Sequence, residues 1–220
     1  MNSRLVIFLL FAAMVLIGVV AFPFMPNTVP IHYGPDGMPN SFGPRWIAAF
    51  SVPLNSIFRT ALFLFAPRIA RLIRRKQSAF AYEDIRNTLR RWCMAYLAFM
   101  LLTQVVLVMG VFGYYGEPMR ILTCGVSILI ITFGNEMGRL RWRSIFGMRV
   151  AWLIKNQAAW ILAPRQAGRI FFICGAVLLL SAVLLPMQFS RHIMMISISM
   201  AIIFSLISSY AIAQRTPQKI

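Results

Sequence analysis

Residues 5–22 read LVIFLLFAAMVLIGVVAF, an unbroken run of apolar and small side chains. About 20 residues of α-helix cross the hydrocarbon core of a bilayer, so a run of this length is typical of a transmembrane helix. It is longer than the core of most secretory signal peptides, and no small-x-small cleavage site follows it. We therefore expect a retained membrane helix here, preceded by Arg4.

The same apolar character continues along the chain. Of its 220 residues, 60% are hydrophobic and 12% are charged, and the mean hydropathy is +0.74. Further apolar stretches predict an all-α fold, a polytopic membrane helical bundle with six transmembrane helices. The expected spans are 5–22, 46–66, 93–114, 121–137, 170–188 and 193–214. They leave no room for a separate soluble module, so we expect a single membrane domain over residues 1–220.

Three segments between these spans hold most of the polar residues. Residues 23–45 contain six of the twelve prolines, which predicts an extended but ordered outer loop. Residues 67–91 and 139–169 are basic loops with eight and seven Lys/Arg. Because a Lys or Arg at a helix centre costs about 2.5–3.5 kcal/mol, we expect 139–169 to be an interfacial or re-entrant segment between the fourth and fifth helices. A seventh span over residues 144–163 is the alternative.

The basic residues also predict the orientation. The N-terminus, the two basic loops and the C-terminal tail hold 18 of the 22 Lys/Arg, whereas the other side has Arg45, Arg120 and Arg191. By the positive-inside rule, both termini and both basic loops are cytoplasmic, and the 23–45 loop faces outward. The net charge of +17 is therefore interpreted as a topology signal, and no direct contact with nucleic acid is expected.

Few residues are candidates for chemistry. His32 and Asp36 could share a metal ion, but two ligands in a proline-rich loop do not define a site. Arg59, inside the second span, either extends its head to the interface or lines a polar path with Asn55, Thr103 and Gln104. Three single cysteines and the absence of any catalytic triad, phosphate loop or carboxylate pair favour a protein that is not an enzyme and has no cofactor.

Two stretches resemble the SdpI-type family of bacterial immunity proteins. The first is FMPNTVPIHYGPDGMPNSFGPRW (24–46), and the second is GNEMGRLRWRSIFGMRVAWLIKNQAAWILAPRQAG (134–168). The positions that match the family patterns are Pro26, Pro30, His32, Gly37, Pro39 and Asn40 in the first, and Gly134, Asn135, Gly147, Arg149, Trp152, Trp160, Arg165 and Gly168 in the second. The chain departs from the family at Arg143, where Asn is usual, and at Val150-Ala151 and Ala163-Pro164, which replace Thr-Pro and Thr-His.

The resemblance implies a non-enzymatic, multi-pass protein of the bacterial cytoplasmic membrane. Its function would be immunity to a secreted peptide toxin, or signalling of envelope stress to a cytoplasmic partner such as a repressor. The outer loop would be the receptor and the 139–169 segment the effector. The suspected functional residues are Asn135, Gly147, Arg149, Trp152, Trp160, Arg165, His32, Asp36 and Arg59. The two tryptophans either anchor the segment at headgroup depth or dock it onto the bundle. A small transporter or lipid-handling protein is the alternative function.

Overall fold

The computed structural model describes residues 3–34, 38–73, 79–114, 117–139, 150–154 and 156–216. Long helices make up most of it, together with one short helix and a two-stranded sheet. The elements in chain order are α1 (Ser3–Ala21), η1 (Phe22–Phe24), β1 (Thr28–Tyr33), β2 (Pro39–Pro44), α2 (Arg45–Ile73), α3 (Ala79–Val111), α4 (Glu117–Met137), α5 (Ala151–Ile154), α6 (Gln157–Leu184) and α7 (Met187–Arg215).

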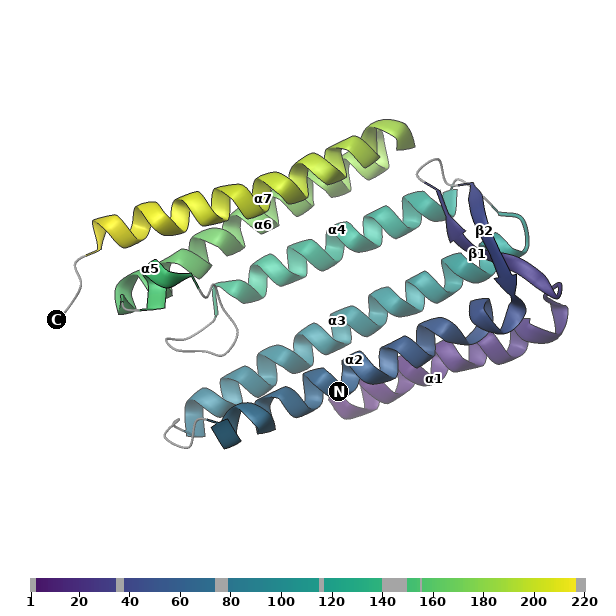
Figure 1. Cartoon of the computed structure of the whole chain (residues 1–220), viewed down its shortest axis with the longest axis horizontal. Coiled ribbons are helices and arrows are strands. Elements are labelled where there is room, and N and C mark those ends of the chain that lie inside the picture. Colours follow the sequence, from purple (N-terminus) through teal and green to yellow (C-terminus); the bar gives the residue numbers. More distant parts are fainter. Residues whose placement is uncertain are drawn as a thin grey trace.

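Six helices in the described part of the chain are long and apolar enough to cross a membrane. This confirms the expected six-span helical bundle. The helices form two groups of three, α1–α2–α3 and α4–α6–α7, and α3 and α4 make the contact between the groups (Figure 1). Aromatic rings pack in this contact, where the ring centroids of Trp92 and Phe133 are 5.1 Å apart.

The helices differ in length. α2 has 29 residues and α3 has 33, so at 1.5 Å per residue they measure about 44 and 50 Å, against a hydrocarbon core of about 30 Å. Both reach the end of the bundle that carries the hairpin, because Arg45 follows β2 and Val111 packs near β1. Their surplus length therefore lies at the opposite end, beyond the first turn of α1 (Figure 1).

The outer loop contains regular structure that the sequence did not predict. η1 is followed by an antiparallel hairpin in which Thr28 of β1 lies opposite Pro44 of β2, and Tyr33 lies opposite Pro39. The register is irregular on both sides of His32. Prolines are accommodated in edge strands, and a two-stranded sheet has no other kind. The proline-rich composition that suggested a loop is therefore compatible with strands.

The hairpin is docked on the ends of the first three helices (Figure 1). Val29 of β1 is fully buried, in a cluster with Met25, the end of α1, the start of α2 and Val111 of α3. Tyr33 lies over Gly110 of α3, where an added Cβ would come within 2.6 Å of the tyrosine Cζ. The hairpin is thus held by packing against three helices.

The segment between α4 and α6 is shorter than expected. α6 begins at Gln157 rather than at Ile170, so residues 157–169 belong to a regular helix. Among the described residues of 144–163, the extended backbone of Asn156 separates α5 from α6, so these residues do not form one continuous span. Only α5, with four residues, is a separate short segment in the described part. The physical reason is length: the 28 residues of α6 measure about 42 Å, so its charged first turns can lie outside the hydrocarbon core.

Candidate functional site

The end of α4 and the first half of α6 approach each other very closely at two glycines. A Cβ at Gly134 would lie 2.7 Å from the backbone oxygen of Gly168 and 2.8 Å from the backbone nitrogen of Phe172. A Cβ at Gly168 would likewise collide with the backbone oxygen of Gly134. Gly134 and Gly168 therefore allow the close packing of α4 against α6 within the chain.

A groove opens beside this close approach. It has a volume of about 430 Å³ and is lined by Asn135 and Gly138 at the end of α4, and by Arg165, Arg169 and Phe172 of α6. Arg165 and Arg169 are four residues apart on one helix, so they share a face. Both side chains and that of Asn135 are exposed. Two guanidinium groups beside an amide can bind a carboxylate or a phosphate.

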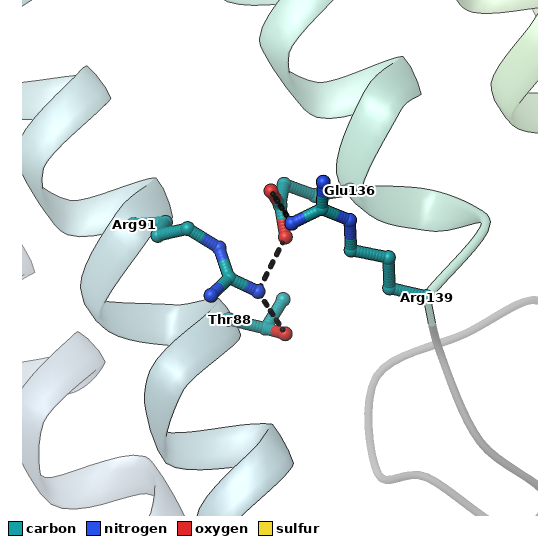
Figure 2. Close-up of polar contacts among 4 residues, drawn as sticks. All are labelled: Thr88, Arg91, Glu136 and Arg139. Atoms are coloured by element: carbon teal, nitrogen blue, oxygen red, sulfur yellow. Dashed lines mark hydrogen bonds and ion pairs between the residues drawn. The ribbon is translucent and has the colours of Figure 1, made fainter.

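The opposite side of the α4 end carries a buried carboxylate. Glu136 is only 3% exposed. Figure 2 shows its two oxygens between Arg91 of α3, at 2.8 Å, and Arg139, at 3.1 Å. Arg91 also donates a hydrogen bond to the Thr88 hydroxyl at 3.2 Å. The carboxylate therefore ties the first helix group to the second, at the same end of α4 as the groove.

The α5 segment is docked on α6 and α7, and the two tryptophans that the sequence singled out lie at this junction. Trp152 donates to the Ser209 hydroxyl at 3.1 Å and makes an edge contact with Tyr210. Trp160 is only 5% exposed and packs in a cluster with Leu153. For Trp160 these contacts favour docking onto the bundle over anchoring in the headgroup layer.

Asn156 is the site residue that sequence reasoning missed. Its side-chain oxygen accepts from the Ala159 amide at 3.0 Å and so caps α6, while its amide nitrogen donates to the backbone oxygen and the hydroxyl of Thr216. The residue is buried. A signal was present, because Asn directly before a helical stretch is a preferred N-cap. The Asn156–Thr216 bonds hold the end of α7 against the start of α6.

In the hairpin, His32 is paired with another strand residue. Its Nδ1 lies 2.6 Å from the Asn40 side-chain oxygen, across the two strands. Asp36, the other suggested metal ligand, lies outside the described residues. No group of three metal-ligating side chains occurs among the residues that the structure describes.

The four residues of the suggested polar path are not brought together. Arg59 is exposed and lies over the Tyr96 ring at 5.8 Å. Asn55 is exposed and donates to its own helix, at Ser51. Gln104 is buried and donates to the backbone oxygens of Ala48 and Ala49. The remaining one, Thr103, bonds within α3.

Like Asp36, the suspected residues Gly147 and Arg149 lie outside the described residues. The structure therefore brings together Asn135 and Arg165 in one groove, and places Trp152 and Trp160 at the neighbouring α5–α6–α7 junction. His32 belongs to the hairpin, which lies at the other end of the bundle from α5 (Figure 1).

Comparison with known proteins matches both regions. Residues 139–211 match the SdpI/YfhL protein family, and residues 9–57 match a domain of unknown function, DUF1648. The chain is also similar to the immunity protein SdpI of Bacillus subtilis (strain 168), with 20% identity over 211 residues, which covers 96% of this chain and 95% of that protein. The chain is thus similar to the SdpI/YfhL family over the part that the family model matches. No solved structure gives a significant match.

The two family matches divide the molecule as its structure does. The DUF1648 match covers most of α1, the hairpin and the first turns of α2. The SdpI/YfhL match begins at Arg139 and includes α5, α6 and most of α7. The chain is therefore a multi-span membrane protein of a bacterial family, and the resemblance drawn from the two sequence stretches is confirmed.

Proposed function

We propose that this chain is a non-enzymatic immunity protein of the cytoplasmic membrane, which protects its cell from a secreted peptide toxin. The observation that carries the proposal is the similarity to an immunity protein over nearly the full length of both chains. The docked hairpin supports a role as the receptor, because a surface held in one shape loses little entropy on binding.

The groove at the other end supports a signalling role toward the cytoplasm. Arg165, Arg169 and Asn135 offer donors for an acidic side chain of a cytoplasmic partner, such as a repressor. The hairpin belongs to the first helix group and the groove to the second, and the Arg91–Glu136 pair joins the groups at the same end of α4 as the groove. A change at the hairpin would reach the groove through the α3–α4 contact.

The proposal also sets the orientation. The hairpin faces outward, and the termini, the basic loops and the groove lie on the cytoplasmic side. The uneven distribution of Lys and Arg, with 18 of 22 at one end, supports this orientation.

Survival of challenged cells tests the immunity function. The chain is produced in a Bacillus subtilis strain that lacks its own SdpI, and the cells are exposed to the toxin against which SdpI protects. We expect survival to rise above that of cells with an empty vector. Full killing of cells in which the chain is present at normal membrane levels would contradict immunity to that toxin.

Arg165→Lys tests the groove. A lysine keeps the positive charge but offers a point charge in place of the planar guanidinium fork, so a directional contact would be lost. We expect normal membrane levels with reduced signalling to the partner, read from a reporter gene. Arg215→Lys, at an exposed position in the last turn of α7, is the matched control. Equal signalling by both variants would reduce Arg165 to a topology signal.

A further inference from the structure

A cavity of about 700 Å³ lies among α1, α2 and α3, at the end of the bundle opposite the hairpin. Its walls along the helices are apolar. Phe8, Ile57 and Leu64 line it and are 66%, 52% and 40% exposed, so the cavity opens on the outer, lipid-facing surface. Four arginines from three helices also line it: Arg4, Arg68, Arg86 and Arg90.

The apolar and basic parts lie at different depths. Along α2 the lining runs from Ile57 to Arg68, which is about 16 Å at 1.5 Å per residue. Arg68 is about 35 Å along α2 from Arg45, which begins the helix at the hairpin end. Because the hydrocarbon core is about 30 Å thick, Arg68 lies at headgroup depth when Arg45 lies at the other interface, and Ile57 lies within the core.

The described residues at the basic end of the cavity carry more positive than negative charge. Arg86 meets Glu83 at 3.0 Å, but no Asp or Glu among the described residues lines the cavity. Arg86 and Arg90 are four residues apart and share one face of α3. Arginines that only set the membrane orientation need not lie close together, whereas Arg4, Arg68, Arg86 and Arg90 all border one cavity with apolar walls.

We propose that this cavity binds one anionic phospholipid, with its phosphate among the arginines and part of an acyl chain along the apolar walls. Guanidinium groups bind phosphate oxygens in pairs of hydrogen bonds. Four arginines favour a headgroup with a net negative charge over a zwitterionic headgroup, whose own cation partly cancels the charge of its phosphate. The volume lies within the range of known ligand sites. The site belongs to the first helix group and does not depend on the proposed immunity function.

Lipid titration of the full-length protein tests the proposal. The protein is purified in a neutral detergent, stripped of lipid and titrated with dioleoylphosphatidylglycerol or dioleoylphosphatidylcholine, and bound lipid is counted by native mass spectrometry. We expect one phosphatidylglycerol to bind at least about tenfold more tightly than phosphatidylcholine, which is about 1.4 kcal/mol. In the Arg86→Gln/Arg90→Gln variant, this preference should fall to about twofold or less.

Two further variants keep the test decisive. Arg215→Gln removes a charge at the same end of the molecule but outside the cavity, and should keep the preference. Ala61→Phe narrows the cavity without changing any charge, and should weaken the binding of both lipids. The proposal is overturned if the two lipids bind equally to the wild type, or if the Ala61→Phe variant binds both lipids as tightly as the wild type does. It is also overturned if inorganic phosphate displaces phosphatidylglycerol at equal concentration, because this would indicate a site for free anions.

Discussion

The buried Glu136 side chain forms an ion pair across the contact between the two helix groups. A carboxylate that is 3% exposed loses most of its hydration, which costs several kcal/mol unless cations and hydrogen bonds replace the water. Arg91 and Arg139 supply that replacement while their own side chains stay 40% and 55% exposed. Because only the carboxylate is fully desolvated, the cluster can stabilise the α3–α4 contact.

Glu136→Gln should lower the free energy of unfolding by about 1–3 kcal/mol, because it removes the charge that Arg91 and Arg139 neutralise. The measurement is thermal unfolding of the purified protein in lipid. Glu83→Gln is the matched control, since the Arg86–Glu83 pair is exposed on both sides and should contribute less than about 1 kcal/mol. Equal losses in the two variants would show that burial of Glu136 does not matter.

The sequence predicted some of these residues and could not predict others. Asn135 and Arg165 followed from the motif and do line one groove. The pairing of Glu136 could not be predicted, because its partner Arg91 lies on a helix far away in the sequence, and pairing across helices leaves no local pattern. Asn156 did have a local pattern, because it precedes a helix as an N-cap.

The α4–α6 contact requires glycine on both helices. Gly134→Ala should separate the two helices, because its Cβ would lie 2.7 Å from a backbone oxygen that cannot turn away. We expect a loss of about 1–3 kcal/mol, measured by thermal unfolding in lipid. Gly138→Ala is the control at the end of the same helix, since its Cβ would meet its nearest neighbour, Cγ of Arg165, at 3.8 Å. Equal stability of the two variants would contradict the close approach.

One polar side chain, that of Asn156, joins the start of α6 to the end of α7. Asn156→Ala removes the cap of α6 and both bonds to Thr216, so it should cost about 1–3 kcal/mol and loosen the end of α7. Limited proteolysis measures the loosening as faster tryptic cleavage after Arg215. Asn55→Ala, which removes only an exposed bond within α2, should leave the cleavage rate unchanged. Unchanged cleavage in Asn156→Ala would mean that apolar packing alone holds the junction.

Hydropathy predicted the elements of the bundle well but failed at their polar ends. Long apolar runs need no partner information, because the bilayer itself favours a helix there. The hairpin was missed because a proline-rich stretch normally argues against strands, although edge strands tolerate proline. Its packing against α1, α2 and α3, which the local sequence does not reveal, stabilises the two strands. The start of α6 was missed because the cost of Arg149 and Lys155 argued against a membrane helix over residues 144–163, whereas α6 begins at Gln157, after both of them.

The whole molecule has a functional polarity. One end carries the docked hairpin, and the other carries the groove, the buried carboxylate and the lipid-facing cavity. The three-helix groups that carry the hairpin and the groove meet along α3 and α4 (Figure 1). A receptor on one side of a membrane and a partner site on the other require this end-to-end arrangement.

Thiol labelling of intact cells tests this polarity most directly. Cys93, Cys124 and Cys174 are first replaced by alanine, and Ser41→Cys, Ser78→Cys and Gln157→Cys are then introduced one at a time. Ser41 lies in β2 and Gln157 at the start of α6, and both side chains are exposed. We predict that a membrane-impermeant maleimide labels only the Ser41→Cys variant, and labels the other two after the cells are opened. Labelling of the Gln157→Cys variant in intact cells, or of the Ser41→Cys variant only after opening, would contradict an outward hairpin and a cytoplasmic groove.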